Sequence, residues 1–384
     1  MIYLDNSATT PLCDSAKEAI KRAMDCYGNP SSLHYEGDSA RSLIESARRS
    51  VMSALGAKNG KLIFTSCGSE ASNLAIFGTV NAKSRRVAKR IITTDSEHPS
   101  VSNALEALEA QGFEIFKLKT KGGILDPADI EEALSSPVFM VSLMLVNNET
   151  GAVYDVPYVF SEIKKKYPEA VCHCDAVQGL LKIKFTPDTL HADMISVSGH
   201  KIHAPKGVGA LWVSDRIIKE RRLVPVLLGG GQENGFRSGT ENTLGIAAFG
   251  AAATECLESF SFDTEKMRAV RAYAIERLSE IPGVSLNIPA DPAPHVVNLT
   301  LPNIKSQTML NFLTAKEICV SSGSACSSHS NKTSQSLISF GLSSNEADCS
   351  LRVSISRYTE KSDIDTLVEA LSVGVRMLVR IKRR

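Results

Sequence analysis

The sequence predicts an α/β protein, with a mainly parallel sheet in a large domain and a smaller α+β domain towards the C-terminus. Strand-like apolar runs alternate with segments of helical periodicity from about residue 60 to residue 260, which is typical of a parallel sheet covered by helices on both faces. Beyond residue 260, helices surround two separate strand-like runs. A chain of 384 residues can also bury two hydrophobic cores. We expect a large domain over residues 15–260 and a small domain made of residues 1–14 and 261–384.

The individual elements follow from apolar spacing and from turn residues. The predicted strands are residues 62–65, 90–94, 113–118, 138–146, 170–174, 194–198 and 208–213, followed in the small domain by 284–288 and 295–301. The predicted helices are residues 69–80, 100–111, 159–166, 243–258 and 264–280, with another that begins at Asp126-Pro127. A capping box from Ser15 to Glu18 predicts the start of the first helix.

Composition excludes several classes of protein. The net charge of +1 gives no reason to expect binding to nucleic acid or to an anionic membrane. No apolar run is long enough to span a membrane, and the opening MIYLDNSATTP lacks the regions of a signal peptide. Nine cysteines are scattered without the spacing of a disulfide framework. We therefore expect a cytoplasmic protein with free thiols.

Small and polar residues follow five of the predicted strands. They are SCGSE at 66–70, DSEH at 95–98, NNETG at 147–151, DAVQ at 175–178 and SGHK at 198–201. The carboxyl ends of parallel strands meet at one edge of a sheet, and ligands bind there. The first group opens a helix and can cradle a phosphate on free backbone amides. No G-x-G-x-x-G motif follows the first strand, so a dinucleotide site is not supported.

Together these groups match what pyridoxal phosphate requires. The cofactor needs a lysine to bind its aldehyde, an acid beside its pyridine nitrogen, a phosphate site and a flat group to stack on the ring. Lys201, held between two predicted strands, supplies the lysine, and Asp175 and His98 supply the acid and the flat ring. The sequence therefore predicts a pyridoxal-phosphate enzyme.

The lysine motif SGHKIHAPKGVGALW resembles that of the class V aminotransferase family of fold-type I pyridoxal-phosphate enzymes. Within this family the chain is similar to the cysteine desulfurases, through YLDNSATTP, NPSSLH, TSCGSEASNLAIFG, EHPSV, NNETG, HCDAVQ, GGGQENGFRSGT and SSGSACSS. The motifs occur in the same order and at matching spacing from the first residues into the C-terminal domain. The resemblance implies a fold-type I transferase and a homodimer.

The resemblance also implies roles for individual residues. Lys201 would hold the cofactor and move the substrate α-proton, Asp175 would pair with the pyridine nitrogen, and His98 would stack on the ring. The remaining cofactor contacts would come from Gly68, Ser69, Ser198 and His200 at the phosphate, from Asn148 and Gln178 near the phenolic oxygen, and from Thr240 reaching the partner subunit's site.

Substrate binding and sulfur transfer are assigned in the same way. Arg352 would clamp the substrate carboxylate, with Asn148 beside it, and Arg357 is close enough in sequence to be an alternative. Cys326, in the small and polar run SSGSACSSHS, would accept the sulfur. Cys67 stands where many relatives have glycine and Ala71 where they have serine. Cys67 is therefore a second thiol close to the phosphate cradle and the alternative sulfur acceptor.

The other cysteines favour a structural interpretation. Cys172 and Cys174 fall on one face of a predicted strand and His173 on the other, and no second ligand pair occurs at zinc spacing. We therefore expect no metal site.

We predict a cysteine desulfurase that converts L-cysteine to L-alanine and leaves a persulfide on Cys326. The sulfur would pass to an acceptor protein, for iron–sulfur cluster assembly or thiolation. The alternatives are a selenocysteine lyase, another class V aminotransferase, and a non-catalytic sulfur-carrier scaffold.

Overall fold

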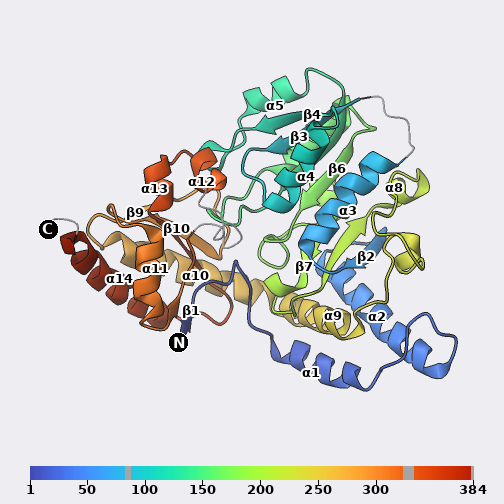
Figure 1. The fold of residues 1–384 in the computed structure, drawn as a ribbon, viewed down its shortest axis with the longest axis horizontal. Helices are drawn as coiled ribbons and strands as arrows, with labels where there is room; N and C mark the ends of the chain where they lie inside the picture. Colours follow the sequence, from blue (N-terminus) through green and yellow to red (C-terminus); the bar gives the residue numbers. More distant parts are fainter. Residues whose placement is uncertain (83–87, 323–332, 382–384) are drawn as a thin grey trace.

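A seven-stranded sheet forms the centre of the larger part of the molecule (Figure 1). The computed structural model describes residues 1–82, 88–322 and 333–381. The strand order is β2-β8-β7-β6-β5-β3-β4, and β8 runs antiparallel to both of its neighbours while the other pairs are parallel. The strands are β2 (Lys61–Thr65), β3 (Arg90–Thr94), β4 (Glu114–Leu118), β5 (Val138–Met144), β6 (Val171–Asp175), β7 (Met194–Ser198) and β8 (Gly209–Val213).

Helices cover both faces of this sheet, which explains why its central strands are buried along their whole length. One hydrophobic cluster joins the sheet to α3 and α4, and another joins it to α2, α6 and α9. The helices of this part are α1 (Asp14–Met24), α2 (Tyr35–Ala54), α3 (Gly68–Asn81), α4 (Pro99–Glu109), α5 (Pro127–Ala133), α6 (Val156–Lys166), α7 (Pro187–Leu190), α8 (Asp215–Lys219) and α9 (Thr243–Glu258).

A smaller antiparallel sheet of order β12-β10-β9 lies beside the large sheet (Figure 1). A third hydrophobic cluster joins it to α10, α11 and α14, and also includes Leu4 from the start of the chain. The strands are β9 (Ser285–Leu286), β10 (Val296–Thr300) and β12 (Ser350–Ser354), and β1 (Ile2–Tyr3) pairs separately with β11 (Ile318–Cys319). The helices are α10 (Phe260–Ser279), α11 (Ser306–Thr314), α12 (Gln335–Phe340), α13 (Ser344–Asp348) and α14 (Lys361–Ile381). The predicted residue limits of the two domains stay a prediction.

The start of α1 corrects one expectation. The capping box from Ser15 to Glu18 is wrong, because α1 begins at Asp14 with Cys13 in the N-cap position. The backbone amide of Ser15 instead donates to Glu255 Oε2 at 3.2 Å, so a tertiary contact with α9 replaces the local cap.

The long helices of the described ranges carry charged residues on their exposed faces. None of them combines the length and the apolar character needed to cross a bilayer.

Candidate active site

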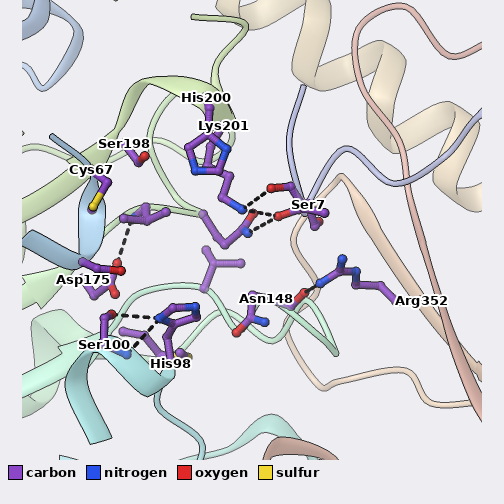
Figure 2. Close-up of a pocket in the computed structure, with 17 residues that line it drawn as sticks. Ser7, Cys67, His98, Ser100, Asn148, Asp175, Ser198, His200, Lys201 and Arg352 are labelled. Atoms are coloured by element: carbon purple, nitrogen blue, oxygen red, sulfur yellow. Dashed lines mark hydrogen bonds between the residues drawn. The ribbon is translucent and has the colours of Figure 1, made fainter. Parts of the chain in front are cut away.

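The carboxyl ends of the parallel strands converge on one pocket (Figure 2). Its walls come from the turns after β2, β3, β5, β6 and β7, together with the N-terminal segment and β12. The lining residues are Ser7, Ala8, Cys67, Gly68, Ser69, His98, Ser100, Met144, Val146, Asn148, Asp175, Val177, Gln178, Ser198, His200, Lys201 and Arg352. The structure thus brings together, in one cavity, side chains that lie far apart in the sequence.

Lys201 ends a single 3-10 turn, Gly199–Lys201, that directly follows β7. Its Nζ donates to the backbone oxygens of Ser7 and Ala8, at 2.5 and 2.9 Å. Figure 2 shows the amine pointing into the pocket towards Ser7. Neutral carbonyls hold the amine in place without forming an ion pair with it.

Asp175 is the last residue of β6 and is 6% exposed. Its Oδ1 accepts a hydrogen bond from the Val177 amide at 3.0 Å. Burial raises the pKa of this carboxyl to about 6, although the Val177 hydrogen bond and the charge of Lys201 act in the opposite direction. A cationic group beside Asp175 would stabilise its ionised form.

His98 forms the N-cap of α4 and lines the pocket. Its Nδ1 accepts from the Ser100 amide at 3.1 Å, which places the ring proton of the neutral form on Nε2. Burial, assisted by the charge of Lys201, lowers the pKa of His98 to about 4. The ring is therefore neutral near pH 7 and suited to stacking against a flat ligand.

The start of α3 forms an anion cradle with the end of β7. The first amides of an α-helix have no intrahelical acceptor, and Gly68 and Ser69 present theirs to the pocket. A Cβ on Gly68 would lie 2.8 Å from Val177 Cγ2, so a larger residue here would require Val177 or the start of α3 to shift. The Ser198 hydroxyl is buried here and has no hydrogen-bond partner among the described residues. This donor set fits a phosphate group.

His200 and Cys67 flank the cradle. Burial lowers the pKa of His200 to about 4, so it is neutral near pH 7, and its Nδ1 lies 3.3 Å from Thr9 Oγ1. Cys67 occupies the N-cap of α3 in extended conformation and makes no side-chain capping bond. The cysteine therefore adds a thiol to the pocket wall beside the first turn of α3.

Arg352 comes from β12 and is 2% exposed. It donates from Nη1 to the Asn148 carbonyl and from Nη2 to Asp5 Oδ1, both at 2.8 Å. Its buried Nε has no acceptor among the described residues. Arg357 instead pairs with Glu255 and Asp263, each at 3.2 Å, and is not part of the pocket lining.

Gln178 connects the two parts of the molecule behind the pocket. Its Nε2 donates to the Ser7 carbonyl at 2.9 Å, and its Oε1 lies 3.3 Å from Nε2 of the buried His295. Asn148 also lines the pocket and lies close to Arg352 (Figure 2).

One predicted site residue among those that the structure describes does not line this pocket. Thr240 is exposed and lines a separate hollow together with Glu233, Arg237 and Glu241. Cys326 lies outside the described residues.

The residues considered for a metal form part of the sheet. His173 lies between Ser142 Oγ and Ser196 Oγ, each 2.8 Å from a ring nitrogen, and burial lowers its pKa to about 3. Both ring nitrogens therefore have hydrogen-bond partners within the core.

Sequence reasoning missed the contributions of Ser7, Ala8 and Asp5. Ser7 and Ala8 contribute only their backbone carbonyls. Every residue has a carbonyl, so the residue type does not reveal this role. The small polar run at residues 6–10 was the available signal. Asp5 is an ordinary strand-end acid until Arg352, distant in sequence, is placed beside it.

Comparison with known proteins places the chain in a family. The profile of the Aminotransferase class-V family matches residues 2–367, and the chain belongs to this family. It is similar to a cysteine desulfurase of Trichormus azollae, with 38% identity over 377 residues that cover 97% of this chain and 92% of the relative. The predicted resemblance to cysteine desulfurases is confirmed.

Solved structures agree. A NifS-like protein matches with a TM-score of 0.89 and 30% identity, covering 98% of this chain and 99% of that chain. A structure described as SspA in complex with cysteine matches with a TM-score of 0.79 and 31% identity, covering 94% and 100%. The predicted fold class is confirmed by these neighbours and by the mainly parallel sheet.

Proposed function

We propose that this protein is a cysteine desulfurase that converts L-cysteine to L-alanine and transfers the sulfur to Cys326. One sulfur atom leaves the substrate β-carbon and bonds to the cysteine thiol, so L-cysteine and Cys326-SH become L-alanine and Cys326-S-SH. The observation that carries the proposal is the arrangement of Lys201, Asp175, His98 and Arg352 around one pocket. The named relatives support the same enzyme class.

Pyridoxal phosphate fits the donor set of this pocket. The unpartnered Ser198 hydroxyl and the first amides of α3 would hold its phosphate, Asp175 would face its ring nitrogen, and His98 would lie against its ring. Gln178 and Asn148 would hydrogen-bond its phenolic oxygen. When bound, the cofactor supplies an aldehyde that an amine can capture and a ring that withdraws electrons from the substrate α-carbon.

The chain's own groups then have distinct tasks. Arg352 offers Nε, which has no acceptor among the described residues, to the substrate carboxylate. Lys201 Nζ takes the α-proton, and the carbonyls of Ser7 and Ala8 orient the amine without neutralising it. Asp175 stabilises positive charge at the position that it faces, since its ionised form is favoured by a cationic neighbour.

The contacts of Ser321 support a role for Cys326. Ser321 and Arg352 exchange backbone hydrogen bonds of 2.7 and 3.1 Å, so the chain passes beside the pocket five residues before the cysteine. Five residues can span roughly 17 Å when extended. A stretch of chain of this length could therefore bring Cys326 to a substrate held by Arg352.

The proposal extends to the assembly and to its partners. Apolar side chains on the α1–α2 connection and near residue 228 are strongly exposed: Tyr27 is 81%, Leu33 93% and Leu228 77% exposed. A second copy of the chain would cover such exposed apolar side chains, and Thr240 would then contribute to the partner subunit's site. We place the enzyme in the cytoplasm, where its persulfide would pass to an acceptor protein for iron–sulfur cluster assembly or thiolation.

A single assay tests this function. The holoenzyme is incubated with L-cysteine and a thiol reductant, and alanine and sulfide are measured together. We expect equal amounts of both. Lys201→Ala should give neither, and Cys326→Ser should give little alanine while still exchanging the substrate α-proton. Alanine formation that depends on an added keto acid would instead indicate an aminotransferase. In a parallel reaction without reductant, which would otherwise reduce any persulfide, a persulfide on the Cys67 peptide with none on the Cys326 peptide would reassign the sulfur acceptor.

A further inference from the structure

Three serine hydroxyls attach α12 to the strand ends that form the pocket. Ser334, the N-cap of α12, donates to Glu149 Oε2 at 2.6 Å. Ser336 and Ser339 donate to the carbonyls of Ser96 and Asp95, at 3.2 and 2.9 Å. These acceptors lie beside the pocket residues Asn148 and His98 in sequence. Helix α12 follows residues 323–332, which we call the Cys326 segment. This helix is thus held against the turns after β3 and β5.

Glu149 is a buried carboxyl that the proposed reaction does not use. It is 4% exposed and is not part of the pocket lining. Two hydrogen bonds fix its backbone. The Glu149 amide donates to Asn147 Oδ1 at 2.9 Å, and the Glu149 carbonyl accepts from Asn298 Nδ2 at 3.2 Å. Burial raises its pKa, and the hydrogen bond from Ser334 partly offsets that effect. Such a buried acid needs a structural reason to be present.

The direction of the bond between Ser334 and Glu149 follows from the helix cap. Ser334 Oγ accepts from the Leu337 amide at 3.2 Å, which uses one of its lone pairs. Its single proton remains available for Glu149, so the carboxyl group acts as an acceptor in this contact. Glutamine could provide the same acceptor, whereas leucine could not.

The chain before the Cys326 segment is also fixed beside the pocket, through the backbone pairing of Ser321 with Arg352. Residues on either side of the segment are therefore attached to neighbours of the substrate site, one by backbone hydrogen bonds and the other by a buried side chain.

We propose that Glu149 is a positioning residue for sulfur transfer, which holds Ser334 beside Asn148 and thereby fixes where the Cys326 segment rejoins the fold. This inference rests on the proposed function and adds a residue to it. Removal of the contact should slow the transfer of sulfur to Cys326 and leave α-proton removal by Lys201 intact, because Lys201 is held by other partners.

The test compares Ser334→Ala and Glu149→Leu with the conservative variant Glu149→Gln. Ser343→Ala is a matched control, because Ser343 caps α13 in the same way: it accepts from the Glu346 amide at 3.3 Å and donates to Glu346 Oε2 at 2.6 Å. Each holoenzyme is mixed briefly with L-cysteine without reductant, and sulfur on the Cys326 peptide is followed by mass spectrometry. Exchange of the substrate α-proton in heavy water is measured in parallel.

We expect Ser334→Ala and Glu149→Leu to form the persulfide about tenfold more slowly, with α-proton exchange within about twofold of wild type. Glu149→Gln and Ser343→Ala should match wild type in both assays. Without substrate, amide hydrogen exchange over residues 333–340 should rise in Glu149→Leu and remain normal in Glu149→Gln.

Wild-type persulfide formation in Ser334→Ala, or an equal loss in Ser343→Ala, would overturn the inference. Loss of α-proton exchange in Glu149→Leu would also overturn it, since Glu149 would then act on the pocket itself. If wild-type Cys326 never carries sulfur while alanine is still formed, the proposed acceptor fails and this inference fails with it.

Discussion

Burial determines the protonation of two groups that line the pocket, His98 and Asp175. Desolvation lowers the pKa of His98 to about 4 and raises that of Asp175 to about 6. The histidine is consequently a neutral ring near pH 7, and the aspartate is an acid whose ionised form gains from a cationic ligand. The same physical effect thus suits His98 to its proposed stacking role and Asp175 to its proposed charge pairing.

Asp175→Asn tests the second of these roles. An amide of the same size cannot stabilise positive charge at the position that the carboxylate faces. We expect exchange of the substrate α-proton to slow by about 10²–10³-fold, in line with electrostatic partners at developing charge. Exchange is measured by mass spectrometry in heavy water with the cofactor-loaded variant. Exchange at the wild-type rate would contradict the assignment.

The two arginines considered for the substrate carboxylate can also be separated. Arg352 lines the pocket, whereas Arg357 is held by Glu255 and Asp263. Arg352→Lys should raise the KM for L-cysteine at least about tenfold, because lysine has no N–H donor at the position of Nε and cannot keep the contacts that hold the guanidinium group in place. Arg357→Lys should leave the KM near wild type. The KM of each variant is measured by steady-state kinetics. A larger KM change for Arg357→Lys than for Arg352→Lys would assign the substrate carboxylate to Arg357.

At the scale of single elements, the anion cradle depends on the close approach of α3 to the turn after β6. A Cβ on Gly68 would lie 2.8 Å from Val177 Cγ2. Gly68→Ala should therefore displace the first turn of α3 and weaken pyridoxal-phosphate binding about tenfold or more. The double variant Gly68→Ala/Val177→Ala removes the obstructing methyl groups and should recover most of the affinity. Equilibrium titration of the apoenzyme with the cofactor provides the measurement. Equal affinity of the single variant and wild type would show that the cradle tolerates the change.

The strand ends were also the part of the site that the sequence could predict. Apolar runs followed by short polar groups locate each turn, and the geometry of a parallel sheet requires these turns to meet. Asp175 and Lys201 were found in this way. The carbonyls that hold Lys201 could not be found, because they belong to backbone that β1 and β11 bring across the molecule. Ser15 shows the same limitation, since its capping motif is overridden by Glu255 from α9.

At the scale of the whole molecule, the chain buries several histidines in neutral form. Burial lowers the pKa of His98 and His200 to about 4, and that of His173 and His203 to about 3, from 6.5. Below pH 6.5 the unfolded chain therefore binds more protons at these sites than the folded chain does, and their contribution to stability is lost as the pH falls. Asp175 and Glu97, whose pKa values are raised to about 6 and 8, act in the opposite direction over this range.

His173 allows one of these contributions to be isolated, because it lies within the sheet between Ser142 and Ser196 and outside the pocket. At pH 5 it should be neutral when folded and protonated when unfolded. His173→Gln should therefore take up about one proton fewer than wild type when it is unfolded at pH 5. Proton uptake is measured as the pH change on unfolding in unbuffered urea. Equal uptake by His173→Gln and wild type would mean that the buried ring is already protonated in the folded protein.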